Sequence, residues 1–274
     1  MNTITPHLGI GDLLIVKMKE ISNNLYFTNI NINKSLIQEF YNENHNFKID
    51  FITKLLNLLF PTSNISITDG PCDFYIFDNL KLKQIYLYNH IDNTLINNTL
   101  INSDNKYSEY IVFHTKMRND SLTDRFINEI LPSLNIFLEK FKTSKTILIL
   151  GEKNIESNFE NDAHKVISLY KSLLLLNKHN NVIDLTVDRV INGVTNIDSF
   201  LYDIELINKA ICNITFGIGG PFNICKAFSK KNISFIPFYN LNKYKQFLDE
   251  YMYIDNSLVE NVKELNNRLE YFIC

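Results

Sequence analysis

Glycine is scarce in this chain, and five of its 8 glycines fall into two short clusters near opposite ends. The first cluster holds Gly9 and Gly11, and the second holds Gly217, Gly219 and Gly220. Glycine is needed where the backbone takes a positive φ or comes close to a ligand. Each cluster also joins an apolar segment to a predicted helix. The two clusters therefore predict two loops that line a ligand cleft from both ends of the chain.

The second cluster has the spacing of an anion-binding loop, because Thr215-Phe-Gly-Ile-Gly-Gly-Pro-Phe-Asn223 leads from a predicted strand into a predicted helix. Glycines let backbone N–H groups turn inward, and a helix N-terminus adds unpaired donors and the positive end of its dipole. Pro221 suits the first helical turn, where it loses no hydrogen bond. Thr215 and Asn223 can add side-chain donors. The segment predicts a phosphate or diphosphate site, and a tight turn packed on a neighbouring strand is the alternative.

Charged side chains follow two other predicted strands. The first of these strands ends in His114, Lys116 and Arg118. If it runs parallel to the strand that enters the second cluster, Lys116 and Arg118 face the same site and neutralise a diphosphate, with Arg118 able to bind two oxygens at once. His114 would then hydrogen-bond a phosphate or a ribose. Glu152 and Lys153 end the next strand in the same way, as a ribose ligand and a weaker phosphate ligand. A solvated charged loop is the alternative.

The first cluster places Asp12 at the start of a predicted helix, shortly after His7. The carboxylate would either cap that helix or act as a general base. An alcohol is too weakly acidic to attack well at neutral pH, so a carboxylate that takes its proton contributes a large rate factor. His7 is a second candidate base or a partner for Asp12, and the sequence leaves both open. Gly9 and Gly11 belong to the same loop.

Strands and helices alternate along the chain at the spacing of βαβ units. Strands are predicted at Leu25–Ile30, Asn64–Thr68, Phe74–Asp78, Gln84–Asn89, Glu109–Thr115, Lys145–Gly151, Val182–Thr186, Ile211–Phe216 and Ile233–Phe238. Leu13–Met18 predicts the start of a helix or a buried segment, and helices are predicted at Lys34–Asn44, Phe47–Phe60, Ser121–Phe141, Asn158–Leu176, Ile197–Ala210, Phe222–Ser229, 241–250 and 257–272. Right-handed crossovers then place the strand-to-helix loops along one edge of a parallel sheet, where ligands bind.

The segment Asp92–Asn105 is almost wholly polar and is predicted to be a linker. It divides the chain into an N-terminal domain at 1–105 and a C-terminal domain at 106–274, and the last helix has the option of packing back on the first domain. The expected fold class is α/β, with two Rossmann-like domains that face each other across a cleft.

Composition excludes several classes of protein. The chain is 45% hydrophobic and 21% charged, with a formal charge of -3, and it lacks the basic excess of a dedicated nucleic-acid binder. It has no apolar run of about 18 residues, as a transmembrane helix would need, and no signal-peptide pattern at its start. The cysteines have no zinc-binding spacing and are predicted to be reduced core thiols of a cytoplasmic protein. They are Cys72, Cys212, Cys225 and Cys274.

These motifs resemble those of the two-domain GT-B glycosyltransferases. The segment Gly9-Ile-Gly-Asp12 is similar to the N-terminal loop of the ADP-heptose-using heptosyltransferases, whose aspartate is the proposed base. The run from Ala210 to Phe228 is similar to the strand–loop–helix that holds the donor diphosphate in that fold. His114-Thr-Lys-Met-Arg118 resembles the His-x-Arg strand end of GDP-fucose-using fucosyltransferases. The second cluster lacks the Asp and His of the heptosyltransferase pattern, so the resemblance implies no heptose donor.

The resemblance implies a transferase that moves a sugar from a nucleoside-diphosphate sugar to a glycan hydroxyl, with inversion. Asp12 would take the acceptor proton, and the loop Gly217–Asn223 with Lys116 and Arg118 would stabilise the diphosphate as charge builds on it in the transition state. No metal and no cofactor beyond the nucleotide sugar is expected, since no DxD motif follows a strand. The alternatives are a pyruvyl transferase, a dinucleotide-dependent oxidoreductase, and a non-catalytic nucleotide- or glycan-binding module. A dinucleotide fingerprint would need glycine in place of Phe222.

Overall fold

The computed structural model of the chain describes residues 3–7, 9–34, 45–69, 80, 85–91, 107–114, 145–150, 181–185, 190–191, 194–195, 197–216, 220–235, 258–259, 267 and 270. These residues form an α/β fold with two parallel sheets, which confirms the predicted α/β class. The smaller sheet has three strands in chain order, β1 (Thr3–Ile4), β2 (Asn29–Asn33) and β3 (Asn64–Thr68). A short antiparallel pair, β7 (Val190–Ile191) and β8 (Val194–Thr195), stands apart from both sheets.

The larger sheet has six strands, and all of its described pairings are parallel. Its strands are β4 (Tyr110–His114), β5 (Thr146–Leu150), β6 (Val182–Asp184), β9 (Cys212–Phe216), β10 (Asn232–Phe235) and β11 (Leu258–Val259). They lie side by side in the order β11-β10-β9-β4-β5-β6. Numbered within this sheet, that is the order 3-2-1-4-5-6 of Rossmann folds, which reverses between β4 and β9. In such sheets, ligands bind outside the carboxyl ends of the two strands at this switch point.

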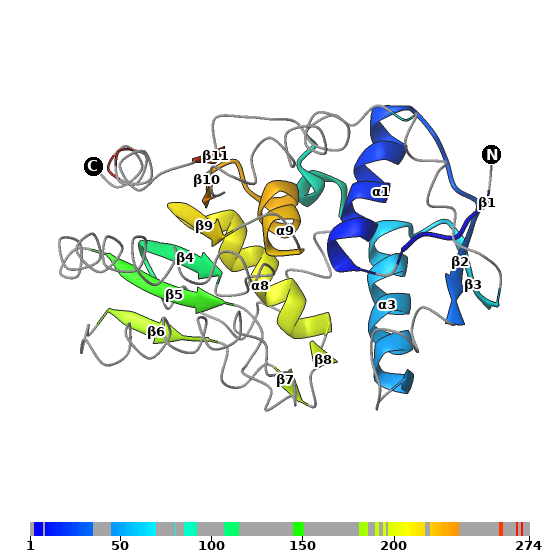
Figure 1. Cartoon of the computed structure of the whole chain (residues 1–274), viewed down its shortest axis with the longest axis horizontal. Helices are drawn as coiled ribbons and strands as arrows, with labels where there is room; N and C mark the ends of the chain where they lie inside the picture. The colour runs from blue at the N-terminus through cyan, green and yellow to red at the C-terminus, as the bar shows by residue number, and fades with distance from the viewer. Residues whose placement is uncertain are drawn as a thin grey trace.

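Helices from both sheets meet in the middle of the molecule. α1 (Ile10–Ser22) and α3 (His45–Leu59) lie beside the small sheet, and α8 (Ile197–Lys209) and α9 (Gly220–Phe228) lie beside the large one (Figure 1). α1 packs on α9, and α3 packs on α8, where the rings of Phe51 and Phe200 meet edge to face with centroids 5.9 Å apart. One cluster of buried hydrophobic residues runs from Ile4 of β1 to Leu148 of β5. The small and large sheets therefore share a continuous core.

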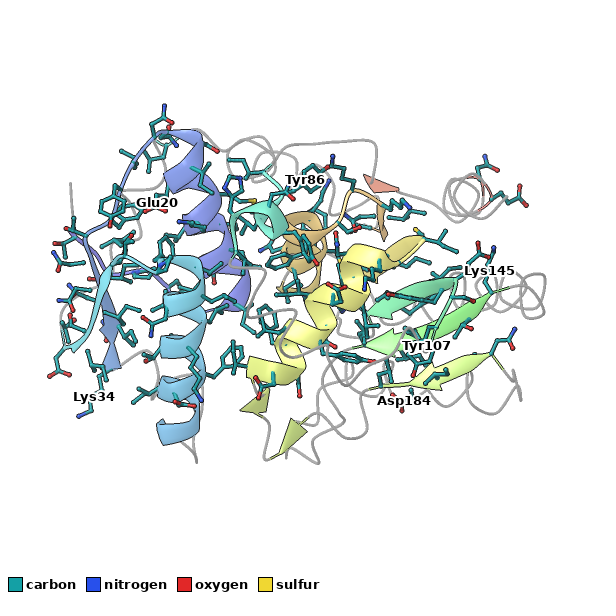
Figure 2. The ribbon with its side chains drawn as sticks, turned by 180° about the vertical axis from the view of Figure 1, so that it is seen from behind. Glu20, Lys34, Tyr86, Tyr107, Lys145 and Asp184 are labelled. Carbon is teal, nitrogen blue, oxygen red and sulfur yellow. The ribbon has the colours of Figure 1, made fainter. Side chains whose placement is uncertain are left out.

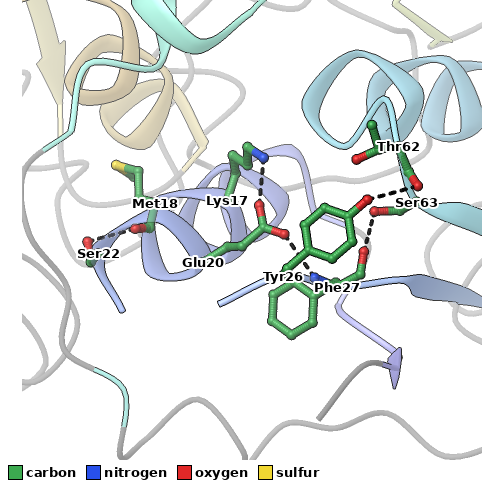
Figure 3. Close-up of polar contacts among 8 residues, drawn as sticks. All are labelled: Lys17, Met18, Glu20, Ser22, Tyr26, Phe27, Thr62 and Ser63. Atoms are coloured by element: carbon green, nitrogen blue, oxygen red, sulfur yellow. Dashed lines mark hydrogen bonds and ion pairs between the residues drawn. The ribbon is translucent and has the colours of Figure 1, made fainter. Parts of the chain in front are cut away.

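A buried carboxylate fixes the connection from α1 to β2. Glu20 is 4% exposed, and its carboxylate accepts hydrogen bonds from Lys17 Nζ at 2.6 Å and from the backbone N–H of Phe27 at 3.0 Å (Figure 3). Lys17 also stands 4.7 Å from the centre of the Phe60 ring. Asn24, just after the helix, has a φ of 51°, which asparagine tolerates at helix ends. This network holds the C-terminal end of α1 in place.

Most elements predicted within the described ranges are confirmed. The helix expected near Leu13 is α1. The helices predicted at Phe47–Phe60, Ile197–Ala210 and Phe222–Ser229 correspond to α3, α8 and α9. The strands predicted at Asn64–Thr68, Glu109–Thr115, Lys145–Gly151, Val182–Thr186, Ile211–Phe216 and Ile233–Phe238 correspond to β3, β4, β5, β6, β9 and β10.

The predicted strand Leu25–Ile30 is wrong in its position, because the strand is β2, Asn29–Asn33. The apolar start of that run forms the end of α1 instead. The N–H of Leu25 donates to the carbonyl of Glu20 at 2.9 Å, and Glu20 also holds the N–H of Phe27. The strand itself has the alternating sequence Asn-Ile-Asn-Ile-Asn, the period of a half-buried strand.

The predicted strand Gln84–Asn89 and the start of the predicted helix 257–272 are also wrong. The structure has a 3-10 helix, η1 (Leu87–His90), where Leu87 is fully buried and the N–H of Asn89 donates to the carbonyl of Tyr86 at 3.2 Å. Packing of Leu87 outweighs the β propensity of this aromatic segment. Leu258–Val259 is the edge strand β11, paired with β10.

Other predictions concern residues outside the described ranges. These are the strand Phe74–Asp78, the linker Asp92–Asn105, the helices Ser121–Phe141, Asn158–Leu176 and 241–250, and all of Lys34–Asn44 except Lys34. Figure 2 shows Lys34 at the small sheet and Lys145 and Asp184 at the large sheet. The division at residue 105 and the cleft between two domains stay predictions.

Candidate functional site at two helix N-termini

The carboxyl ends of β4 and β9 lie side by side. The two strands are parallel neighbours, with Ile111 opposite Cys212 and Phe113 opposite Ile214. His114 therefore ends β4 at the level where β9 enters the second glycine cluster. The predicted parallel alignment of these strands is confirmed. Several predicted site residues follow the ends of β4, β5 and β9 but lie outside the described residues: Lys116, Arg118, Glu152, Lys153, Gly217 and Gly219.

His114 is a buried imidazole at this switch point. Its side chain is 5% exposed, and within the described part of the chain its Nε2 atom has no hydrogen-bond partner. Burial lowers the pKa of His114 to about 4, so the ring is neutral near pH 7. Leaving a buried polar atom unsatisfied costs about 1–3 kcal/mol, and such atoms in native structures need an explanation. The neutral His114 imidazole is therefore suited to form a hydrogen bond with a bound ligand.

The N-terminal end of α9 has the features expected of an anion site. The helix begins at Gly220 with Pro221 in its first turn, as predicted. A Cβ on Gly220 would meet no atom within 4 Å, so there is open space beside this residue. In the last turn of the same helix Lys226 is buried, and burial lowers the pKa of its ammonium group to about 8. Thr215 is engaged elsewhere, since its hydroxyl pairs with the hydroxyl of Ser234 on β10.

At the N-terminal end of α1, His7 and Asp12 form a pair. His7 Nδ1 lies 2.9 Å from Asp12 Oδ2, and the side chains are 27% and 49% exposed. The backbone N–H of Gly9 points at the same Nδ1 from 3.3 Å. An ionised carboxylate only accepts hydrogen bonds, so Nδ1 carries a proton when it bonds to ionised Asp12 and is bare when it accepts from Gly9. Nδ1 therefore serves one of these two hydrogen bonds at a time.

Gly9 has a steric role beneath this pair. A Cβ on Gly9 would lie 2.3 Å from Asp12 Oδ2, so a side chain there would displace the carboxylate. Gly9 also occupies the N-cap position of α1. Asp12 therefore does not cap the helix but lies inside its first turn, where a negative charge favours the positive end of the helix dipole.

The first glycine cluster contacts the helix that follows the second cluster, where α1 packs on α9. A Cβ on Gly11 would lie 2.6 Å from Asn223 Nδ2 and 3.2 Å from Asn223 Cβ. Asn223 is 7% exposed, and its Oδ1 has no partner among the described residues. The helix ends that carry Asp12 and the anion site are thus in direct contact. The sequence predicts that both clusters line one cleft, but it does not predict this contact. The one feature that could have indicated the contact is a glycine inside a helical turn, because glycine there costs helix stability.

Other expectations bear on the surroundings of the site. Within the described ranges, no group of three His, Cys, Asp or Glu side chains is placed to hold a metal ion. None of the described helices has the length and apolar character needed to cross a membrane. Cys212 and Cys225 are buried free thiols, and burial raises the pKa of both. Cys72 and Cys274 lie outside the described residues.

Comparison with known proteins finds little similarity to this chain. No protein-family model and no curated protein matches it. Among solved structures it is similar to the trehalose-6-phosphate synthase OtsA, with a TM-score of 0.35 and 8% identity. The match covers 94% of this chain and 62% of that one, so the chain spans less than two thirds of the length of OtsA. A likeness of this size carries no argument about activity.

Proposed function

We propose that this protein is a glycosyltransferase of the GT-B type, which moves a sugar from a nucleoside-diphosphate sugar to a hydroxyl of a glycan acceptor. The observation that carries the proposal is the contact between α1 and α9, made by Gly11 and Asn223. It brings a carboxylate on one helix end beside an anion-binding helix end that follows the switch point of a Rossmann sheet. A sugar transfer of this kind needs a base for the acceptor and a site for the donor diphosphate close together.

The diphosphate of the donor would bind at the N-terminal end of α9. The first-turn N–H groups and the open space beside Gly220 suit phosphate oxygens. Neutral His114 would donate or accept one hydrogen bond, according to its tautomer. Lys116 and Arg118 follow His114 in the sequence and would add the positive charge that stabilises the leaving diphosphate.

The acceptor hydroxyl would meet Asp12 at the N-terminal end of α1. Asp12 is half exposed, so a hydroxyl arriving from solvent has access to its carboxylate. Asp12 would take the hydroxyl proton as the oxygen attacks the sugar carbon. If that proton goes to Oδ1, Oδ2 continues to accept the hydrogen bond from the protonated Nδ1 of His7 at 2.9 Å. His7 would therefore hold Asp12 in place before and after proton transfer.

A dinucleotide-dependent oxidoreductase uses the same strand order, but the loops differ. Its glycine-rich turn follows the first strand of the sheet. In this chain that strand is β4, and it is followed by Thr-Lys-Met-Arg-Asn-Asp, which contains no glycine. The glycine cluster follows β9, the fourth strand of the sheet in chain order. The loop after β9 therefore favours a nucleoside diphosphate over a dinucleotide.

Thermal-shift measurements with UDP, GDP, ADP, CMP and NAD test the donor class. We expect one nucleoside diphosphate to raise the melting temperature at concentrations where NAD has no effect. Incubation of the protein with the matching nucleotide sugars and a panel of glycan acceptors should then release the free nucleoside diphosphate. Stabilisation by NAD alone would contradict the proposal, and tight nucleotide binding without any transfer or donor hydrolysis would favour a non-catalytic binding module.

A further inference from the structure

The first turn of α1 has a notch at Gly11, and the Asn223 side chain of α9 occupies it. The contact is tighter than ordinary packing allows for any larger residue, since a Cβ on Gly11 would stand 2.6 Å from Asn223 Nδ2. The backbone of Asn223 does not have room to give way easily, because the same Cβ would stand 3.2 Å from Asn223 Cβ. The separation of the two helix ends is therefore set by the absence of one side chain.

Internal hydrogen bonding does not account for the place of Asn223. The side chain is 7% exposed, and its Oδ1 has no partner among the described residues. Burying an amide in this way costs free energy. An alanine here would avoid that cost and would be a better helix former. The amide therefore contributes something other than stability to this junction.

We propose that the contact between Gly11 and Asn223 is a positioning device that sets the distance and direction from the Asp12 carboxylate to the ligand at the N-terminal end of α9. This inference rests on the proposed function. Asp12 follows Gly11 directly, so any shift of the Gly11 backbone moves the carboxylate with it. Misplacing a reacting group by about 1 Å can lower a rate a hundredfold.

The test compares Gly11→Ala with the wild type. The added methyl group pushes α1 away from α9, so we expect kcat for transfer from the nucleotide sugar to fall about 10- to 100-fold. The dissociation constant for the nucleoside diphosphate should change less than about threefold, because α9 keeps its donors. Ser22→Thr is the matched control. It adds one methyl group to the opposite end of the same helix, where Ser22 Oγ bonds to the carbonyl of Met18, and it should leave both quantities unchanged.

A rescue separates positioning from general damage. In an Asn223→Ala background the Nδ2 and Cγ atoms that a Cβ on residue 11 would meet are gone, and only Asn223 Cβ remains at 3.2 Å. Adding Gly11→Ala to that background should therefore cost at most about threefold in kcat, which is a strong departure from additivity. If Gly11→Ala fails to fold, Asn223→Gln takes its place. Its longer side chain crowds the same contact from α9, so it should lower kcat by a similar factor.

The outcomes distinguish this inference from the proposed function. If the wild type binds no nucleoside diphosphate and turns over no nucleotide sugar, the proposed function fails and the positioning role fails with it. If the wild type is active and Gly11→Ala keeps its full kcat, only the positioning role is wrong. The positioning role is equally wrong if Gly11→Ala loses nucleotide affinity as strongly as kcat, or if it costs as much in the Asn223→Ala background as in the wild type.

Discussion

The N-terminal ends of α1 and α9 touch each other, yet they differ in character. The α1 end is open to solvent, with Asp12 49% exposed and paired with His7. At the α9 end, Gly220 and Pro221 are half-buried, and Phe222 and Asn223 are below 9% exposure. The α1 end presents an exposed carboxylate–imidazole pair, and the α9 end presents backbone donors in a less exposed setting, where electrostatic interactions are stronger.

This difference indicates that glycine at the start of a helix can have two different roles. Glycine at the α1 end makes room for a carboxylate, because a Cβ on Gly9 would collide with Asp12. Glycine at the α9 end leaves open space, because a Cβ on Gly220 would meet nothing within 4 Å. The first arrangement positions a protein side chain, whereas the second suits a ligand. Four predictions test whether the α1 end holds the reacting carboxylate and the α9 end holds the ligand.

The largest effect is expected for Asp12→Asn. The substitution keeps the shape of the side chain and removes its capacity to take a proton, and general bases contribute about 100- to 10,000-fold to rates. We expect kcat for sugar transfer to fall at least about 100-fold by that principle, with nucleotide affinity unchanged by calorimetry. An Asp12→Asn variant with wild-type kcat would remove the catalytic role from the α1 end.

The second prediction concerns charge at the α9 end. Lys116→Gln combined with Arg118→Gln should weaken nucleoside-diphosphate binding about 100-fold or more, since charge-assisted hydrogen bonds contribute about 1.5–3 kcal/mol each and two are removed. Lys54→Gln is the control, because Lys54 is an exposed lysine on α3 paired with Asp50. Equal affinities of the double variant and the control by calorimetry would show that Lys116 and Arg118 do not bind the diphosphate.

The third prediction uses the burial of His114. Its pKa of about 4 in the folded protein lies below the ordinary value of 6.5, so the unfolded chain binds a proton first as pH falls. Stability is therefore complete above about pH 6.5 and declines as pH falls towards 4. At pH 4.5 the loss from this group is about 2–3 kcal/mol, at 1.36 kcal/mol per pKa unit.

Urea unfolding of the wild type and of His114→Gln at pH 7 and pH 4.5 measures this loss. The variant has no imidazole to protonate, so it should lose about 2–3 kcal/mol less than the wild type between the two pH values. The same slope in both proteins would mean that burial does not hold His114 neutral.

The smallest effect is expected at the opposite end of α1. Glu20→Gln weakens the bonds to Lys17 and to the Phe27 N–H, and removing one partner of a buried charged network costs about 1–3 kcal/mol. The free energy of unfolding should fall by that amount. Nucleotide affinity and kcat should stay at wild-type values, because Glu20 lies more than two helical turns from Asp12. If activity falls by more than the fraction of folded protein does, catalysis depends on the whole of α1 and not only on its N-terminal end.

Several strands of the large sheet could be predicted from the sequence for a physical reason. Tyr110–His114 and Thr146–Leu150 are short, largely apolar runs, as buried parallel strands are. Their alternation with helices predicts the parallel pairing. The reversal of strand order between β4 and β9 depends on which strands pair across the chain, and local patterns do not encode that.

The errors arose where tertiary contacts override local preference. Leu25 and Phe27 have strand character, yet their N–H groups complete the end of α1 through Glu20. Leu87 lies in an aromatic run that predicts a strand, yet it is buried from a 3-10 helix. The contact of Gly11 with Asn223 joins residues from opposite ends of the chain, so only the scarcity of glycine hinted at it.

The most direct test of the central claim is a crystal structure with the nucleoside diphosphate that stabilises the protein most. We predict that the diphosphate oxygens accept hydrogen bonds from the first-turn N–H groups of α9 and that the Asp12 carboxylate faces the same site from α1. A diphosphate bound elsewhere on the large sheet, or one at α9 from which Asp12 is turned away, would contradict a single site shared by the two helix ends.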